Sequence, residues 1–448
     1  MTSTFERMLS NIDYSAFGKS EDLKKRIYFT LAALIVYRLG TFLPLPGVDP
    51  GIMASVATEQ SKGLLAYLNT FSGGALERMT IFALGIMPYI SASIIVQLLS
   101  SVMPSLEALK KDGEQGRKRM NQYTRYLTVF LAIVQGYGMA VGLEIMTSNG
   151  VSAVIYPGIF FRLTSVVTLT GGTLFLMWLG EQITSRGIGN GVSLLIFAGI
   201  VANLPRAVQS TLELGMLQKS SVLFILGVFS LVIGMIAIIV FMERAQRRIL
   251  IQYPRRQVGK KIIGGENSHL PIKINVSGVI PPIFASSILV LFSTLATLLA
   301  SKSESVFGNL PIYLSGGHPI RMFIFVLFIL FFAFFYTSIV FNPVETAENL
   351  KKNGAFVLGY RPGDDTANYF DYVLTRLTVV GALYLAFICA IPEFLMTKVN
   401  IPFYLGGTSL LIVVGVAMDT VAQVHSHLLA HQYKSLINKS QIGARSSR

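Results

Sequence analysis

Ten long stretches of this chain are almost free of charged residues, and their lengths decide which folds are open to it. The stretches are residues 27–48, 79–106, 126–143, 163–180, 187–205, 220–242, 274–301, 322–344, 377–392 and 399–418. A helix needs about 20 apolar residues to cross a hydrocarbon core of roughly 30 Å. Strands of a membrane β-barrel instead alternate over about 10 residues, whereas these stretches are continuous. The sequence therefore predicts an all-α polytopic membrane protein with ten transmembrane helices.

Composition supports a membrane protein and excludes other classes. Charged residues make up 13% of the chain and hydrophobic residues 52%, whereas soluble proteins carry roughly 25% charged residues. Disorder is excluded because disordered chains are poor in apolar residues. Cys389 is the only cysteine in the sequence, which rules out a disulfide scaffold and most cysteine-based metal sites.

The lysines and arginines between the stretches predict the orientation. When the N-terminus is placed in the cytoplasm, most of the 37 lysines and arginines fall on the cytoplasmic side. This asymmetry follows the positive-inside rule, with both termini cytoplasmic. It also accounts for the net charge of +14 without nucleic-acid binding. The first 26 residues are polar, so we expect an uncleaved first helix rather than an ordinary signal peptide.

Residues 64–79 do not resemble an ordinary span. The segment is moderately apolar, contains the pair Gly73-Gly74, and precedes a strong span on the outer side. It is either a short interfacial helix or a re-entrant segment that fills a cavity. A re-entrant segment requires protein or water around it, because irregular backbone is not tolerated against lipid.

Two long cytoplasmic loops carry local structure. Residues 247–253 and 270–276 both alternate between polar and apolar side chains, which predicts a β-hairpin within the loop 243–273. The loop 345–376 begins with a short predicted helix, and its turn presents Arg361 outward. The basic residues of both loops either fix the topology or form docking surfaces for large partners.

Chemical motifs are scarce. The chain has no Walker loop, no HExxH and no GxSxG, and these motifs mark nucleotide, zinc and serine-hydrolase sites. His427 and His431 are four residues apart and could share a helix face as metal ligands, but a solvated tail is the favoured interpretation. Arg38 is an ionisable residue near the outer end of the first span, where we expect it to be paired or to reach the membrane surface.

Two glycine-rich runs, residues 187–191 and 406–409, open later spans. They either permit close helix packing or shape a pore. A secondary transporter with inverted repeats is the main alternative to a channel, but it would need polar substrate ligands near the middle of the membrane. A membrane-embedded enzyme would need a constellation of His, Asp or Ser within the spans, and none is visible in the sequence.

Strings spread over nearly the whole chain resemble the SecY family, the channel subunits of bacterial protein translocases. They are FSGGAL (71–76), IFALGIMPYISASIIVQLL (81–99), NQYTRYLT (121–128), FLMWLGEQITSRGIGNGVSLLIFAGIV (175–201), ERAQRRI (243–249), SGVIPPIFASSI (277–288), FNPVETAENLKKNGAF (341–356), RPG (361–363) and FYLGGTSLLIVVGVAMD (403–419).

The resemblance implies two inverted five-helix halves, residues 27–205 and 220–427. The polar N-terminal segment 1–26, the external connection 206–219 and the cytoplasmic tail 428–448 flank and join them. It also implies a ring of aliphatic side chains that closes the waist of the channel. The ring positions are Ile86, Ile90, Val192, Ile196, Ile283 and Ile412. Family members usually have isoleucine at the position of Val192, so we expect a slightly looser seal there.

A plug and a lateral gate follow from the same resemblance. The plug corresponds to residues 64–79, with Phe71, Gly73 and Gly74 at its core, and it would fill the outer funnel at rest. We expect it to pack only marginally, since it must leave when the channel opens. The lateral gate would lie between the second and seventh spans. Its predicted polar residues are Ser91, Ser93, Gln97 and Asn190.

Partners and energy sources are implied in the same way. A channel of this family has no cofactor, no metal and no catalytic residue, and the SecA ATPase or a translating ribosome drives transport. We expect docking at Arg255, Arg256 and Arg361, with Tyr360 replacing the usual isoleucine beside the last of them. Further expected partners are SecE-like and SecG-like subunits, signal sequences of unfolded preproteins, membrane lipids, SecDF and YidC. The expected location is the bacterial inner membrane.

Overall fold

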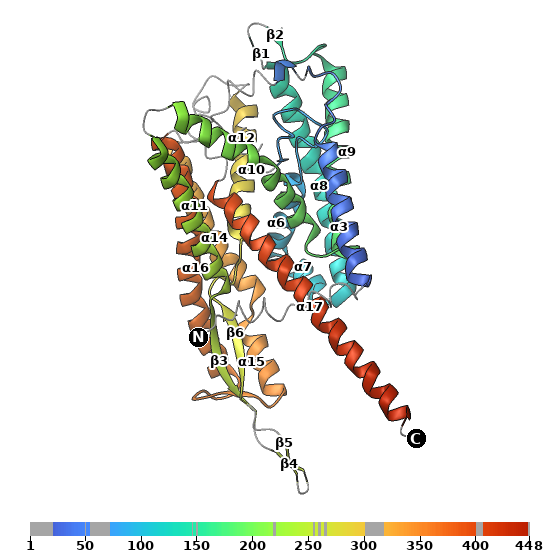
Figure 1. Ribbon diagram of the computed structural model, residues 1–448, viewed down its shortest axis with the longest axis vertical. Coiled ribbons are helices and arrows are strands. Elements are labelled where there is room, and N and C mark those ends of the chain that lie inside the picture. The colour runs from blue at the N-terminus through green and yellow to red at the C-terminus, as the bar shows by residue number, and fades with distance from the viewer. Residues whose placement is uncertain are drawn as a thin grey trace.

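Helices make up most of the protein and run side by side in a single bundle (Figure 1). The computed structural model describes residues 21–49, 51–53, 72–145, 147–148, 151–217, 221–253, 256–258, 261–263, 267–300, 318–399 and 406–446. Each of the ten predicted stretches overlaps a helix within these residues. Seven of the described helices are long and apolar enough to cross a membrane, so the all-α polytopic fold is confirmed.

The first half of the chain supplies six described helices. They are α3 (Glu21–Gly40), α6 (Met87–Val102), α7 (Pro104–Lys111), α8 (Gly113–Ile145), α9 (Ile159–Arg186) and α10 (Gly191–Leu217). Pro205 lies inside α10, and the helix continues through residues that the sequence assigns to the external connection. A membrane helix tolerates an internal proline when its neighbours satisfy the freed carbonyl group.

The second apolar stretch is helical only in part. It starts at residue 79, but α6 begins at Met87, and the preceding residues form turns. Met79 and Gly85 have positive φ angles of 42° and 57°, which a continuing helix cannot contain. Thr80 also pairs with Pro44 in an isolated β-bridge. This long-range pairing holds the turns inside the bundle, and it cannot be read from local apolar content.

The second half supplies six more described helices. They are α11 (Ser221–Arg244), α12 (Ile280–Ala300), α14 (Pro319–Val340), α15 (Pro343–Lys352), α16 (Asp364–Val399) and α17 (Gly407–Ser446). Asn342 caps α15 by accepting hydrogen bonds from two backbone amides, and Gly354 follows the helix with φ of 71°. An asparagine cap and a glycine just after the last turn are common start and stop signals of a short helix.

The helices pack in a closed circuit. Following the contacts from α6, the order is α8, α9, α10, α17, α16, α14, α12 and back to α6. One large cluster of buried apolar side chains fills the circuit and contains residues from both halves of the chain. The two halves therefore meet twice around this circuit, where α6 contacts α12 and where α10 contacts α17.

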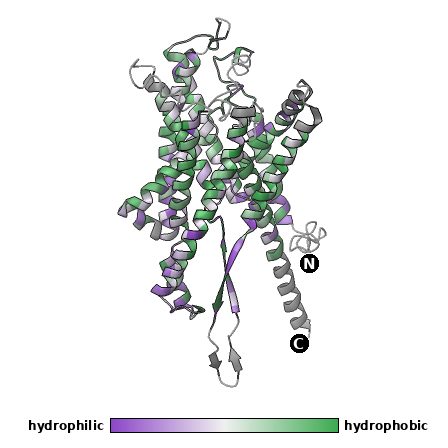
Figure 2. Cartoon of the chain, turned by 90° about the vertical axis from the view of Figure 1, so that its left-hand side faces the viewer, coloured by the Kyte–Doolittle hydropathy of each residue, from purple (hydrophilic) through white to green (hydrophobic). Residues whose placement is uncertain are grey.

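A β-hairpin projects from one end of the bundle, as Figure 2 shows. Its strands β3 (Gln246–Gln252) and β6 (Asn267–Lys273) are antiparallel, and β7 (Phe356–Val357) pairs with the other edge of β3. Strands β4 (Arg256–Val258) and β5 (Lys261–Ile263) continue it toward its tip. Strands β1 (Thr147–Ser148) and β2 (Val151–Ser152) form a separate pair. The predicted hairpin is therefore confirmed.

A small core anchors the hairpin to the bundle. Ile249 and Ile272 pack with Ala347 of α15 and Phe370 of α16. Figure 2 shows that hydrophobic residues cover the helical bundle, whereas the projecting strands contain more hydrophilic residues. This end of the protein is thus a distinct polar layer with its own core.

Candidate functional site

The six predicted ring residues all lie at or near the N-terminal ends of four helices. Ile86 precedes α6 and Ile90 lies in its first turn, while the others fall within the first two turns of α10, α12 and α17. Ile86, Ile90, Ile196 and Ile412 are buried in the large central cluster. Val192 and Ile283 are partly buried and pack against the same cluster. All six positions therefore belong to or pack against the same large apolar cluster, and their closure of a pore stays a prediction.

Local sequence determines where three of these helices start. Pro88 lies in the first turn of α6, and Pro281 and Pro282 lie in the first turn of α12. Proline suits this position because the first amide groups of a helix have no partner within it. Asn190 caps α10 by accepting hydrogen bonds from the amides of Val192 and Ser193, at 3.1 and 3.5 Å.

Polar groups close to Ile283 are already used. The hydroxyls of Ser286 and Ser287 both donate to the carbonyl oxygen of Ile283 at 2.8 Å. Both serines are buried. Because these hydroxyls bind their own helix, the first turns of α12 present mainly hydrocarbon to the centre of the bundle.

Val192 differs from the other ring positions in its surroundings. A Cβ atom added to Gly180 of α9 would lie 3.2 Å from Cγ2 of Val192. One of its methyl groups therefore lies where α10 crosses α9. The role of Val192 in the ring stays a prediction, and this contact gives it an additional packing function.

Only the last part of the predicted plug belongs to the described residues, and Phe71 lies outside them. Residues 72–76 are buried, and residues 73–79 form turns rather than a helix. Ala75, Leu76 and Met79 are nearly inaccessible. This arrangement favours a re-entrant segment over an interfacial helix. The burial of these three side chains is greater than marginal packing would produce.

The predicted gate helices contact each other. The hydroxyl of Ser287 on α12 lies 3.9 Å from the sulfur atom of Met87 on α6, a weak polar contact that the sequence did not single out. Ser91 is buried in α6. The amide nitrogen of Gln97 donates to Ser93 at 3.3 Å, so these two predicted gate residues satisfy each other within one helix.

Asn190 lies away from this contact. It caps α10, which packs against α3, α9, α11 and α17. Its exposed side chain is thus accounted for by the start of a helix. A gate function for Asn190 stays a prediction.

Two of the three predicted docking residues, Arg256 and Arg361, lie on the polar layer. Arg361 is exposed on the turn between Gly359 and Gly363, whose positive φ angles of 87° and 117° require glycine. Tyr360 stacks on Tyr369 with ring centroids 4.2 Å apart, so the larger residue finds its own partner and leaves Arg361 accessible. Arg255 lies outside the described residues, and Arg256 is described only by its backbone in β4.

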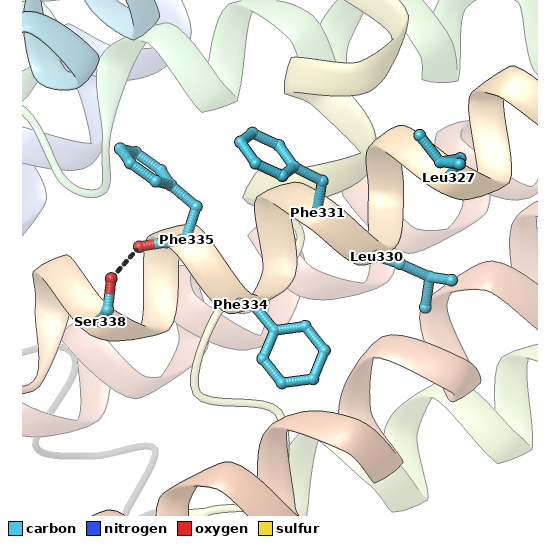
Figure 3. Close-up of a pocket in the computed structure, with 6 residues that line it drawn as sticks. All are labelled: Leu327, Leu330, Phe331, Phe334, Phe335 and Ser338. Atoms are coloured by element: carbon cyan, nitrogen blue, oxygen red, sulfur yellow. Dashed lines mark hydrogen bonds between the residues drawn. The ribbon is translucent and has the colours of Figure 1, made fainter.

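A groove of about 600 Å³ lies on α14 (Figure 3). It is lined by Leu327, Leu330, Phe331, Phe334, Phe335 and Ser338. The hydroxyl of Ser338 donates to the carbonyl oxygen of Phe335 at 2.7 Å. Because every lining residue belongs to α14, this groove is separate from the convergence of helix starts.

Metal binding finds no support among the described side chains. In that part of the chain, no group of three or more His, Cys, Asp or Glu residues is placed to hold an ion. The side chain of His431 is outside it, so the pair His427 and His431 stays a prediction from spacing.

A closed circuit of apolar helices around an apolar centre, six of the eight long enough to cross a membrane, defines a polytopic helical membrane protein. The model of the SecY family matches residues 80–421 of this chain. The chain therefore belongs to the SecY family, and it is a protein-conducting channel rather than a secondary transporter.

Similar proteins support this assignment. The protein translocase subunit SecY of Rickettsia conorii is 54% identical and covers 94% of this chain and 97% of its own length. SecY of Escherichia coli K12 is 51% identical, with 96% and 97% covered. A solved protein-conducting channel has a TM-score of 0.65 at 17% identity, covering 90% of this chain and 92% of its own. Canine Sec61 in a ribosome-channel complex has a TM-score of 0.63, with the same identity and coverage.

Proposed function

We propose that the chain passes unfolded preproteins across the bacterial inner membrane and releases apolar segments sideways into the lipid. What supports this proposal is that six aliphatic side chains, all near the starts of four helices, belong to or pack against one large apolar cluster. Aliphatic groups offer no hydrogen bonds, so the ring does not hold back a passing polypeptide, whatever its sequence. They also make a narrow pore dry and thereby block ions.

The segment 64–79 closes the outer funnel in this proposal. Residues 72–76 of this segment are buried and residues 73–79 form turns rather than a helix, which is compatible with a segment that fills a cavity in the protein. In a solved channel of similar fold, the plug domain of the SecY protein stabilises the closed state of the translocation channel and maintains a membrane seal. The same role is proposed for this segment.

The contact between α6 and α12 serves as the lateral gate. Hydrophobic contacts and a long contact between Ser287 and Met87 hold it. A signal sequence has an apolar core of about 7–15 residues, and it would replace such contacts without breaking a strong hydrogen bond. Binding then shifts a closed-to-open equilibrium through its higher affinity for the open state.

Energy comes from partners on the cytoplasmic side, because the chain itself acts without a cofactor and not as an enzyme. SecA or a translating ribosome would dock on the polar layer around Arg255, Arg256 and Arg361. The canine relative was solved in a ribosome-channel complex, which supports the ribosome as one partner. SecE-like and SecG-like subunits, SecDF, YidC and membrane lipids complete the proposed set.

Both termini lie in the cytoplasm in this proposal. Arg26 near the start of α3 donates to the carbonyl oxygen of Gly187 at 3.5 Å. Gln423 near the middle of α17 accepts from the amide of Gly189 at 2.9 Å. The start of α3 and the middle of α17 therefore both lie beside residues 187–189. In Figure 1 the hairpin and the end of α17 project in the same direction.

Reconstitution tests the proposal. Vesicles that contain this chain with SecE-like and SecG-like subunits should protect a signal-bearing precursor from protease when SecA and ATP are present. A precursor without its signal, and a reaction without ATP, are the controls. Uptake of a small solute without SecA, together with no protected precursor, would favour a transporter instead.

A further inference from the structure

One face of α10 lies against the described part of the segment 64–79. Gly199, Asn203 and Arg206 are spaced by four and three residues, so they share a helix face. A Cβ atom added to Gly73 would lie 3.0 Å from Cα of Gly199. One added to Gly74 would lie 3.5 Å from the amide oxygen of Asn203.

The third contact is an ion pair at the outer end of the same face. Arg206 and Glu77 are 3.5 Å apart, and their side chains are 55% and 37% exposed. An exposed pair of this kind contributes little energy. It adds a third contact to those of Gly73 with Gly199 and Gly74 with Asn203, and the three contacts run in the same order along the segment and along α10.

Helix α3 holds the segment from another direction. Arg38 donates a hydrogen bond from Nη1 to the carbonyl oxygen of Gly73 at 2.8 Å. The Tyr37 hydroxyl also donates to the carbonyl oxygen of Ser72 at 3.4 Å. A hydrogen bond from a charged donor is stronger than one between neutral groups. The paired Arg38 expected from the sequence therefore has its partner in this segment.

The guanidinium group of Arg38 is itself held in place. Its Cζ lies 5.1 Å from the ring centroid of Phe42, and that of Arg78 lies 4.3 Å from the same centroid. Both distances are typical of cation–π contacts. Since Phe42 lies two residues beyond the end of α3, the position of Arg38 depends only partly on the segment it binds.

Gly73 is the point at which both helices meet the segment. Its φ angle of 68° is rare for residues with a side chain. A Cβ atom there would also approach Nη1 of Arg38 to 3.4 Å and the carbonyl oxygen of Gly199 to 3.3 Å. A side chain at this position would therefore push the segment away from α10 and from Arg38 together.

We propose that the face of α10 formed by Gly199, Asn203 and Arg206, together with Arg38 of α3, is a seat that holds residues 73–77 in the closed channel. This inference rests on the proposed function, in which residues 64–79 close the channel. Arg38 is a positioning residue whose single charged hydrogen bond biases the segment toward its closed position. When the segment leaves, the guanidinium exchanges the carbonyl for water, so the seat is reversible.

Resting ion conductance in planar bilayers measures how strongly the seat holds the segment in its closed position. Arg38→Met removes the donor and should raise resting conductance roughly tenfold, since a hydrogen bond to a charged group is lost. Arg38→Lys keeps a charged donor and should recover part of the seal. Gly73→Ala should raise conductance as well, whereas Gly278→Ala, at a similar φ angle of 61° in open space, should not.

Cross-linking measures the position of the segment independently of its sealing. Cysteines in the double variant Glu77→Cys and Arg206→Cys should be joined by a short thiol-reactive linker in the resting channel. A signal-bearing precursor and SecA should reduce the yield. Glu77→Cys with Val208→Cys is the control, because residue 208 lies on another face of α10.

The results separate the seat from the plug. If deleting residues 64–79 raises conductance while Arg38→Met does not and no cross-link forms, the seat is overturned and closure by the segment stands. If the cross-link forms but deletion leaves conductance unchanged, the segment lies on α10 without sealing the channel, and the proposed closure is overturned. Both positive results together support the seat.

Discussion

Arg321 and Glu393 show at the residue scale how charges are accommodated inside an apolar bundle. Arg321 lies in the first turn of α14 and Glu393 follows Pro392 in α16. Their side chains are 9% and 20% exposed and their charged atoms are 2.9 Å apart. Removing one member of such a pair leaves a charge that neither water nor a partner stabilises. The pair therefore joins two helices, and breaking it by removing one partner should destabilise the fold.

Glu393→Leu should lower the free energy of unfolding by about 3 kcal/mol, because it leaves Arg321 without its carboxylate. The double variant Arg321→Met with Glu393→Leu should recover most of that loss. Thermal unfolding of the detergent-purified protein measures both. The exposed pair Glu348 and Lys352 (3.7 Å apart) is the control, and Glu348→Leu should cost less than about 1 kcal/mol. Equal losses for the two single variants would contradict this account.

At the scale of single elements, the sequence predicts local signals well and long-range ones poorly. Asn342, Pro343 and Gly354 mark the ends of α15 because each acts through neighbouring backbone. The late start of α6 was not predictable, since the turns before it depend on a bridge between Pro44 and Thr80.

The candidate site shows the same division. The resemblance placed the ring isoleucines on four helices, and the structure brings them into one buried cluster. The contact between Met87 and Ser287 could not be predicted from the sequence, because 200 residues separate the two positions and neither residue belongs to a distinctive motif. Asn190 caps α10, a function that its position just before a helix would have predicted, and its gate function stays a prediction.

The turn that carries Arg361 is the element through which an ATPase would act on the channel. Arg361→Glu should abolish SecA-driven translocation, because it reverses a charge on an exposed docking turn while the stack of Tyr360 on Tyr369 keeps the turn folded. Protease protection of a precursor measures the loss. Lys352→Glu makes the same charge change on the neighbouring helix and should have a small effect. Normal translocation by the Arg361→Glu variant would refute the role.

At the scale of the whole molecule, the two halves are joined unequally. On one side α12 contacts α6 and α8, whereas on the other α10 contacts α11 and α17, and α17 contacts α3 as well. Gln423 adds a hydrogen bond to Gly189 on this second side. The halves should therefore part between α6 and α12 and stay joined at α10 and α17, as a hinge on one side requires.

A disulfide across the weaker side should lock the channel. In the double variant Met87→Cys and Ser287→Cys, the new thiols replace side chains whose sulfur and oxygen atoms are 3.9 Å apart. Oxidation should block both translocation and lateral release, and reduction should restore them. Cys389 is buried in α16 and should not interfere. Unimpaired translocation by the oxidised variant would show that the halves part elsewhere.

Photo-cross-linking from a stalled precursor tests most directly whether polypeptide passes the point where the four helices begin. A benzophenone side chain is placed at Ile283 or Ile412, in the proposed ring, or at Phe241, which is 71% exposed on α11. The account predicts precursor adducts at residues 283 and 412 and none at residue 241. Adducts that form at residue 241 while residues 283 and 412 stay unreacted would contradict it.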